Sequence, residues 1–251
     1  MLLQLIRREM RSRFVGSSAG WLWLIVNPLL LLGVYAVVFG MIFRARAPEA
    51  LDVPFVAWLA VALWPWLGFS EAILRASESI PEHAALISKV PMQRELLPLS
   101  SAAASFLLQM AGYAVVLGVI AAAGVGLAPA GALNALFVLA VLLVLGCGIG
   151  LIAGALRVFF RDLQQLLPTL LMLWFFLTPI LYAPELLPEQ LRILVYANPI
   201  AGLMTELRAA LLEGDALPSG YAAGMALVAA AVVAAGLWFF RRLAPFFEDF
   251  L

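Results

Sequence analysis

Apolar runs long enough to cross a membrane are the feature that most constrains this chain. Apolar residues make up 65% of its 251 residues and charged residues only 12%, which is more apolar surface than a soluble core of this size can hide. An α-helix of about 20 residues rises about 30 Å, the thickness of the hydrocarbon core of a bilayer. Segments of alternating polarity are absent from the sequence, which argues against a barrel. The sequence therefore predicts an all-α integral membrane protein.

Six such runs are expected to span the membrane within a single domain that covers residues 1–251. They lie at about residues 21–43, 54–74, 101–125, 132–156, 166–182 and 220–240. Between the last two, residues 183–219 are too apolar for an ordinary loop and too interrupted for a full span. We expect two short helices there, at about 185–196 and 199–213, that dip into the membrane or lie on it. Asn198 and Pro199 would begin the second one. Its expected apolar stripe comprises Ile200, Leu203, Met204, Leu207 and Leu211.

The first residues predict an amphipathic helix before the first span, within residues 1–20. The run MLLQLIRREMRSRF places apolar side chains on one helical face and Gln4, Arg8 and Arg11 on the opposite one. Such a helix would lie in the membrane interface, with its arginines reaching the anionic headgroups. The expected apolar face comprises Leu3, Ile6, Met10 and Phe14.

The distribution of basic residues predicts the orientation, because six spans put both termini on one side. With cytoplasmic termini, the inner segments carry eleven of the fifteen Lys and Arg residues, as the positive-inside rule requires. The polar interval 78–100, which holds the only lysine, Lys89, and the only histidine, His83, is then cytoplasmic. The four outer residues are Arg44, Arg46, Arg192 and Arg208.

Four glycines in the predicted fourth span indicate close helix packing. Gly146, Gly150 and Gly154 recur every four residues, with Gly148 beside them. Small residues at this spacing let a neighbouring backbone approach closely. We expect these glycines to serve packing and not function.

The sequence shows no catalytic or nucleotide-binding constellation. One cysteine, Cys147, and one histidine cannot build a metal cage, and no activated nucleophile or carboxylate pair is visible. A P-loop requires a lysine after glycine, whereas Lys89 follows Ser88. No ionisable residue lies near the middle of a predicted span, so ion coupling is not indicated. The chain is therefore expected to be a transport permease and not an enzyme. It would bind no metal, nucleic acid or cofactor, and a partner subunit would hold ATP and Mg²⁺.

Aromatic residues are concentrated in the first, second and fifth predicted spans. Tyr35 and Phe39 share one face of the first, and Trp174 and Tyr182 lie in the fifth. An interfacial belt with lipid-facing rings accounts for such residues. A conduit wall, on which flat rings stack against sugar faces, accounts for them as well.

Five stretches of the sequence carry a family resemblance. In chain order they are RREMRSRFVGSSAGWLWLIVNPLLLLGVYAVVF, PWLGFSEAILR, ALISKVPMQRELLPLS, FFRDLQQLLP and NPI. Together they resemble the membrane subunit of bacterial polysaccharide-exporting ABC transporters, the O-antigen, capsule and teichoic acid permeases, over nearly the whole chain. The resemblance implies a type 2 ABC exporter in the bacterial cytoplasmic (inner) membrane. It would be a homodimer that pairs with two copies of a cytoplasmic ATPase subunit and moves a lipid-linked polysaccharide, such as O-antigen or capsule.

The resemblance implies a coupling helix and an outer gate, and with the hypotheses of a lipid-carrier contact and an aromatic channel this gives expected roles for four sets of residues. A coupling helix after the second span would receive the push of the ATPase through Glu82, His83, Leu86, Lys89 and Arg94. The interface helix would attract the pyrophosphate of a lipid carrier through Arg7, Arg8 and Arg11, for which plain headgroup binding is an equal alternative. The channel would be lined by Tyr35, Phe39, Trp174 and Tyr182. Re-entrant helices would form the outer gate with Tyr196, Asn198, Pro199 and Glu206.

Three other functions stay open at this point. The same fold could export a drug, a lipid or another small amphiphile. An intramembrane enzyme that modifies glycans or lipids would turn over substrate without a nucleotide-binding partner. A non-transporting scaffold could be lost without any change in the glycan at the cell surface.

Overall fold

The computed structural model describes residues 1–12, 20–43, 47, 53–87, 93–184 and 187–250. Every regular element among them is helical, as predicted. The α-helices are α1 (Leu2–Ser12), α2 (Gly20–Tyr35), α3 (Phe55–Glu82), α4 (Ala84–Ile87), α5 (Leu96–Ala122), α6 (Ala132–Phe159), α7 (Leu163–Leu177), α8 (Glu189–Tyr196), α9 (Pro199–Arg208) and α10 (Gly220–Leu243). Two π-helical turns, η1 (Ala36–Ile42) and η4 (Ala209–Glu213), extend α2 and α9, and the 3₁₀ turns η2 (Pro129–Gly131) and η5 (Ala244–Asp249) precede α6 and follow α10.

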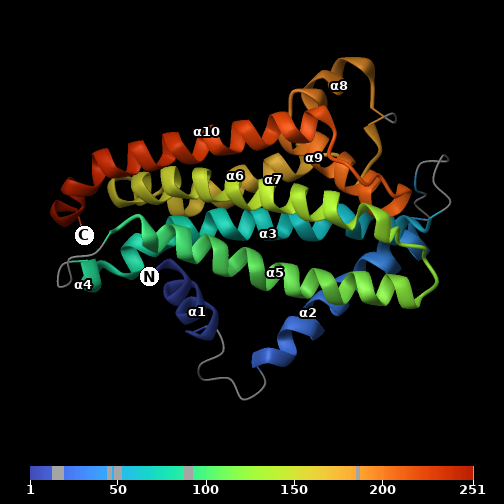
Figure 1. Ribbon diagram of the computed structural model, residues 1–251, viewed down its shortest axis with the longest axis horizontal. Helices are drawn as coiled ribbons and strands as arrows, with labels where there is room; N and C mark the ends of the chain where they lie inside the picture. Colours follow the sequence, from blue (N-terminus) through green and yellow to red (C-terminus); the bar gives the residue numbers. More distant parts are fainter. Residues whose placement is uncertain (13–19, 44–46, 48–52, 88–92, 185–186, 251) are drawn as a thin grey trace.

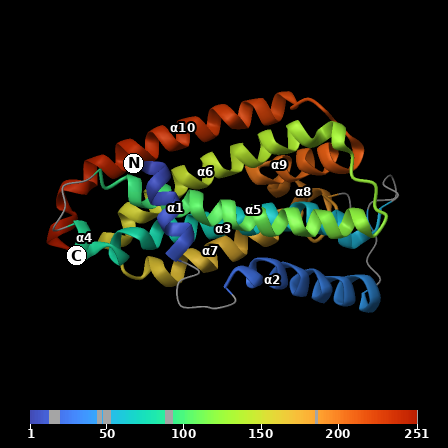
Figure 2. The same ribbon diagram turned by 60° about the horizontal axis from the view of Figure 1, so that its bottom comes forward.

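The long helices form a bundle around α3 (Figure 1). α3 packs against α5 and α6, and α6 also packs against α10. Because α3 is apolar around most of its circumference, it lies in the core, whereas α2 lies at the edge of the bundle (Figure 2). We call the end that carries α4 and the C-terminus the α4 end, and the opposite end, with α8 and α9, the α9 end.

Five of the described helical segments are long and apolar enough to cross a membrane. They are Ile25–Ile42, Phe55–Glu82, Leu96–Ala122, Pro129–Phe159 and Gly220–Asp249. The predicted fifth span, 166–182, is shorter than expected, since α7 ends at Leu177. Thr178 leaves the helix with an extended backbone because the following Pro179 disfavours the helical conformation in the residue before it. The described ranges therefore contain five helices of spanning length and a shorter apolar helix of 15 residues.

α3 extends beyond the second span predicted at 54–74 and enters the polar interval 78–100. α3 continues through residue 78 to Glu82, and α5 already begins at Leu96, so both ends of the 78–100 interval are helical. The extension of α3 is supported by Arg75, whose guanidinium binds Glu71 at 2.9 Å and Glu78 at 3.3 Å, one helical turn away on either side.

The two short helices expected between the last spans are confirmed as α8 and α9. α9 begins at Pro199, after an Asn198 cap whose side-chain oxygen accepts from the Ile200 backbone N–H. The predicted apolar stripe is buried in the main core of the bundle. α9 is therefore packed into the main core of the bundle.

The glycines of α6 let the neighbouring helices α3 and α10 approach closely, as predicted. A Cβ atom at Gly150 would lie 2.5 Å from the Cβ of Ala76 in α3, and one at Gly154 would lie 3.0 Å from the Ala76 carbonyl oxygen. On the α10 side, a Cβ at Gly148 would lie 2.8 Å from the Val232 backbone. Only glycine leaves room for these contacts, so α6 acts as the spacer between α3 and α10.

A tyrosine compensates for the proline in the middle of α3. Pro65 has no N–H, so the carbonyl of Val61, four residues earlier, lacks its helical donor. The Tyr113 hydroxyl, from α5, donates to that carbonyl at 2.9 Å and is buried with it. The hydrogen bond joins α5 to α3 at the point where the proline weakens the helix.

Replacing this tyrosine by phenylalanine (Tyr113→Phe) is expected to lower the free energy of unfolding by about 1–2 kcal/mol, because the Val61 carbonyl then stays buried without a donor. Chemical unfolding of the purified protein in detergent measures the loss. Tyr196→Phe is the matched control, since the Tyr196 side chain is 75% exposed, and should unfold like the wild type. Equal midpoints for all three proteins would contradict this role of Tyr113.

Candidate functional site

The coupling residues predicted after the second span lie where α3 ends. Glu82 is the last residue of α3 and is exposed, and His83 caps the helix. The His83 Nδ1 atom lies 2.9 Å from the carbonyl oxygen of Ser79, which can only accept, so Nδ1 carries the proton. The helix then turns into the four-residue α4 (Ala84–Ile87). The side chain of Leu86 and all of Lys89 lie outside the described part of the structure.

Arg94 does not share the exposed position of Glu82. Its guanidinium donates to the carbonyl of Ala244 and to the Glu248 carboxylate, in the segment that follows α10. Nearby, Arg241 binds Glu95 at 2.9 Å. These contacts join the start of α5 to the end of the chain.

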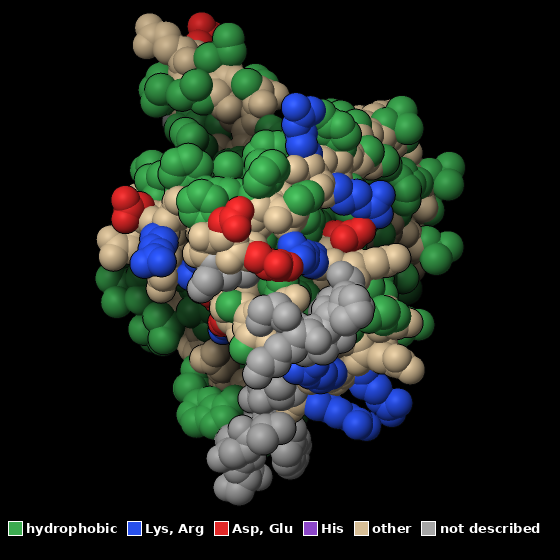
Figure 3. All heavy atoms as spheres, turned by 90° about the vertical axis from the view of Figure 1, so that its left-hand side faces the viewer, with side chains coloured by type: hydrophobic (Ala, Val, Ile, Leu, Met, Phe, Trp, Pro, Cys, Tyr) green, Lys and Arg blue, Asp and Glu red, His purple; other side chains and the backbone are tan. Residues whose placement is uncertain are grey.

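A second charged group, which the sequence reasoning missed, joins α3 to α6 at the same end. The Arg157 guanidinium lies 3.2 Å from the Ser77 hydroxyl oxygen and 3.5 Å from the Glu78 carboxylate. Figure 3 shows acidic and basic side chains gathered across this end of the molecule. The α4 end is therefore a charged face crosslinked between α3, α5, α6 and α10.

Gln4, Arg8 and Arg11, the predicted polar side of α1, are exposed. Arg7 is exposed as well, and α1 packs against α5. Leu3, expected on the apolar face, is 80% exposed. The half-buried residues are Leu5, Ile6, Glu9 and Met10, so the packed face is turned towards positions 5 and 9. Phe14 lies outside the described residues.

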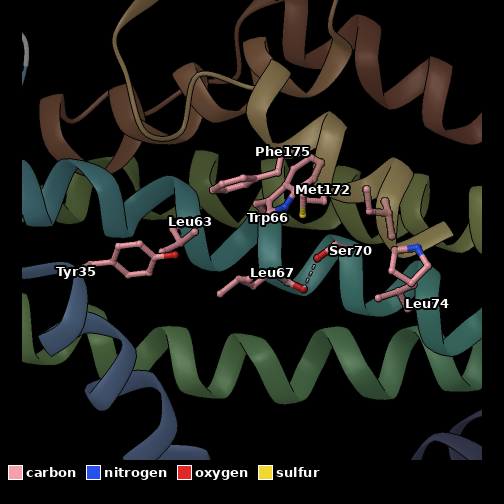
Figure 4. A pocket seen from close by; sticks show the side chains of 10 residues that line it. Tyr35, Leu63, Trp66, Leu67, Ser70, Leu74, Met172 and Phe175 are labelled. Atoms are coloured by element: carbon pink, nitrogen blue, oxygen red, sulfur yellow. Dashed lines mark hydrogen bonds between the residues drawn. The ribbon is translucent and has the colours of Figure 1, made fainter. Parts of the chain in front are cut away.

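A groove between α2, α3 and α7 contains one of the predicted channel residues. Tyr35 reaches into it from α2, Trp66 and Ser70 line it from α3, and Met172 and Phe175 line it from α7 (Figure 4). Its volume is about 250 Å³. The Ser70 hydroxyl donates to the Leu67 carbonyl within α3, so the remaining wall is almost entirely apolar and aromatic.

The other three predicted channel residues do not line this groove. The ring of Phe39 stacks on Tyr35 at 5.7 Å between centroids, which confirms that the two share a face. Tyr182 donates its hydroxyl to the Phe176 carbonyl at 2.9 Å. Trp174 packs edge-on against Trp66 and Phe69, and its indole N–H is also bonded within the chain. Trp66 and Phe175 are groove residues that the sequence reasoning left unassigned.

At the α9 end, a channel residue and a gate residue predicted separately are bonded to each other. The Trp174 indole N–H donates to the Asn198 side-chain oxygen at 2.9 Å. The Asn198 amide donates in turn to the Thr178 hydroxyl at 2.9 Å and to the Leu177 carbonyl at 3.3 Å. Asn198 is buried, so this network ties the start of α9 to the end of α7.

We expect Asn198→Ala to lower the free energy of unfolding by about 2–3 kcal/mol, because the Trp174 N–H and the cap of α9 lose their acceptor. Combining it with Trp174→Phe should cost less than the sum of the single changes, by about 1 kcal/mol. Unfolding midpoints of the four proteins measure this coupling. Asn27→Ala, at an exposed asparagine in α2, is the control. Strict additivity would show that the hydrogen bond contributes nothing.

The remaining gate residues differ in exposure. Tyr196 is 75% exposed, and the Pro199 carbonyl accepts from the Tyr221 hydroxyl at 2.9 Å. Glu206 accepts from the Asn134 amide at 3.0 Å and from the Ser219 backbone N–H at 2.9 Å. Burial by itself raises the pKa of Glu206, but these hydrogen bonds outweigh it and hold the pKa below its usual range.

A buried arginine in α9 is the feature of this end to which the sequence analysis assigns no contact. Arg208, one of the four basic residues expected on the outer side, is only 5% exposed. Its guanidinium donates to the carbonyls of Trp58, Pro179 and Ile180 at 3.2, 2.8 and 3.0 Å. Its central carbon lies 3.4 Å from the centroid of the Trp58 ring. One side chain thus fastens α9 to the start of α3 and to the turn after α7.

Comparison with known proteins gives consistent matches over most of the chain. The sequence profile of a family described as ABC-2 type transporter matches residues 2–212. The O-antigen export system permease protein RfbA of Myxococcus xanthus is 33% identical over 241 residues, which cover 93% of this chain and 87% of the relative. A protein of the same name from Klebsiella pneumoniae is 26% identical and covers 100% of this chain and 95% of its own length. The polysialic acid transport protein KpsM of Escherichia coli is 28% identical, with 84% of this chain and 80% of the relative covered.

Proposed function

Because this chain belongs to the ABC-2 type transporter family, we propose that it is the membrane subunit of an exporter that moves a cell-surface polysaccharide across the membrane. The observation that carries the proposal is the similarity over nearly its full length to relatives named for O-antigen export and polysialic acid transport. The permease works with a separate ATPase subunit. The cargo is a lipid-linked polymer of the O-antigen or capsule type, and the membrane is the bacterial cytoplasmic membrane, with both termini inside.

The shape of α3 supports a route from the ATPase to the outer gate. α3 has 28 residues, which corresponds to a rod of about 42 Å at 1.5 Å per residue. Glu82 and the attached α4 lie at one end of the rod, and the Trp58 carbonyl that binds Arg208 lies at the other. A push on α4 moves this rod, and the α8–α9 pair follows through Arg208.

Two further features support a homodimer whose seam contains the conduit. The groove lined by Tyr35, Trp66 and Phe175 is open to the surface of the bundle. Apolar side chains next to it on α2 and α7 are exposed, including Leu30, Val34, Met172 and Phe176. A second copy would cover these side chains and close the groove into an aromatic passage. The exposed Arg7, Arg8 and Arg11 then meet the pyrophosphate of the lipid carrier at the entrance.

Deleting the gene in the bacterium that carries it tests the function. Polysaccharide should disappear from the surface while lipid-linked polymer accumulates inside, and the wild-type gene supplied on a plasmid should restore export. An unchanged surface polysaccharide would overturn the proposal. Loss of efflux of a drug or a lipid, with the surface polymer intact, would identify an exporter of small amphiphiles instead.

A further inference from the structure

The residues after α10 fold back over the α4 end and do not extend away from it. α10 ends at Leu243, and η5 (Ala244–Asp249) turns the chain beside α4, as both ribbon views show (Figures 1 and 2). We name residues 244–250 the C-terminal hook. The hook lies beyond residue 212, where the family profile ends.

The hook supplies a central side chain to a small core that is separate from the main one. Phe247 is fully buried and contacts the ring of Phe240 at 5.2 Å and that of Phe159 at 6.0 Å between centroids. The same core contains Ile80 near the end of α3 and Ile87 of α4. Its buried members are Ile80, Ile87, Leu97, Leu151, Ala155, Val158, Phe240 and Phe247.

This core determines where α4 lies. A helix of four residues has no stability of its own in water, so packing has to fix its direction. Ile87 is 4% exposed and is the buried side chain among the described side chains of α4. The anchor of α4 is therefore a core that Phe247 completes.

Polar contacts hold the hook against the start of α5. Arg94 binds the Ala244 carbonyl and the Glu248 carboxylate, at the two ends of η5. Phe250 packs against Phe159 at 4.9 Å between centroids. Phe250 also lines a pocket of about 260 Å³ beside α4, together with Pro81, Ala84, Arg157, Arg161 and Gln164.

We propose that the C-terminal hook is a positioning element of the surface that receives the ATPase subunit, and that it holds α4 in place through Phe247 and the Arg94–Glu248 pair. The inference rests on the proposed function, because it takes the partner at the α4 end to be that subunit. Phe247 and Arg94 are positioning residues that act through α4. Arg94 thereby acquires a role different from the direct contact expected from the sequence.

A spin label on α4 tests the positioning step without any partner. The label is attached to Ala85→Cys in a Cys147→Ala background, with the full chain in lipid nanodiscs. Phe247→Ala should shift the spectrum towards the mobile component. Phe246→Ala is the matched control, since Phe246 is the same residue type one position earlier and is 54% exposed, and it should leave the spectrum unchanged. A wild-type spectrum for Phe247→Ala would overturn the proposal.

If Phe247→Ala does not yield folded protein, a charge exchange decides the question. Arg94→Glu and Glu248→Arg each place like charges together and should mobilise the label, whereas the double exchange should recover most of the immobile component. A double variant as mobile as the single ones would overturn the proposal.

The docking step is measured with the ATPase subunit that copurifies with the wild-type chain from the source cells. Variants with a mobile α4 should retain about tenfold less of it. If variants with a mobile α4 retain as much ATPase subunit as the wild-type chain does, the position of α4 does not affect docking and this part of the proposal is refuted. Failure of the wild-type chain to retain any ATPase would refute the proposed function instead, and the spectra would still report on the hook.

Discussion

Replacing Gly150 by leucine (Gly150→Leu) is expected to force α6 away from α3 and to lower the free energy of unfolding by at least about 3 kcal/mol. Even the first atom of a new side chain would lie 2.5 Å from the Ala76 Cβ, far inside van der Waals contact. Ala76 is fully buried and its Cβ is fixed to the helix backbone, so it cannot turn aside. The helices have to separate, and the buried contacts between them are lost together.

The matched control is Gly118→Leu, at a helical glycine in α5 with no atom within 4 Å of a new Cβ. Thermal unfolding of both variants in detergent, followed by the loss of the monodisperse peak in size-exclusion chromatography, separates steric overlap from the simple loss of a glycine. The control should melt at or above the wild-type temperature, because leucine favours a helix more than glycine does. Gly150→Leu melting together with the control would show that α6 can shift without cost.

This contact illustrates how much of the fold could be predicted from the sequence. The positions of the long helices follow from apolar runs, and the close packing of α6 follows from glycines at four-residue spacing. Both signals are local. The helix ends were harder to predict, because α3 continues past its apolar run into polar sequence and Pro179 ends α7 inside an apolar run.

The candidate site was less predictable because its contacts join distant parts of the chain. Arg94 and Glu248 are 154 residues apart, and no periodicity links them. Trp174 and Asn198, which are only 24 residues apart, are hydrogen-bonded to each other. Both residues were predicted to be functional, but no sequence pattern indicates that they are in contact.

For Arg208 a local signal was present. Ile200, Met204 and Arg208 follow one another at four-residue spacing, so Arg208 lies on the apolar stripe of α9 itself. A charge on such a stripe has to be buried or has to stop the helix from packing. The structure buries it against carbonyls, which is a long-range arrangement that the stripe alone could not specify.

Replacing this arginine by methionine (Arg208→Met) is expected to lower the free energy of unfolding by about 3–5 kcal/mol and to abolish export. Methionine fills much of the same space but donates no hydrogen bond, so the buried carbonyls of Pro179 and Ile180 lose their donor. The stacking on Trp58 is lost as well. Arg208→Lys keeps the charge, but its point-like ammonium cannot serve three carbonyls in the fork geometry of a guanidinium, so we expect an intermediate loss.

Unfolding midpoints in detergent and surface polysaccharide in cells measure the two effects. Arg192→Met is the matched control from the same pair of helices, because Arg192 is only half-buried and donates to the Leu187 carbonyl near the surface. It should cost less than about 1 kcal/mol and should leave export intact.

The Arg208→Lys variant separates ATPase binding from export. The α4 end is unchanged in it, so the variant should still retain the ATPase subunit and its ATP hydrolysis. It should export less polymer, because α3 joins α4 to the Trp58 carbonyl, and that carbonyl reaches α9 through Arg208. Full export by Arg208→Met, or equal losses for Arg208→Met and Arg192→Met, would show that α3 does not drive the outer helices through this side chain.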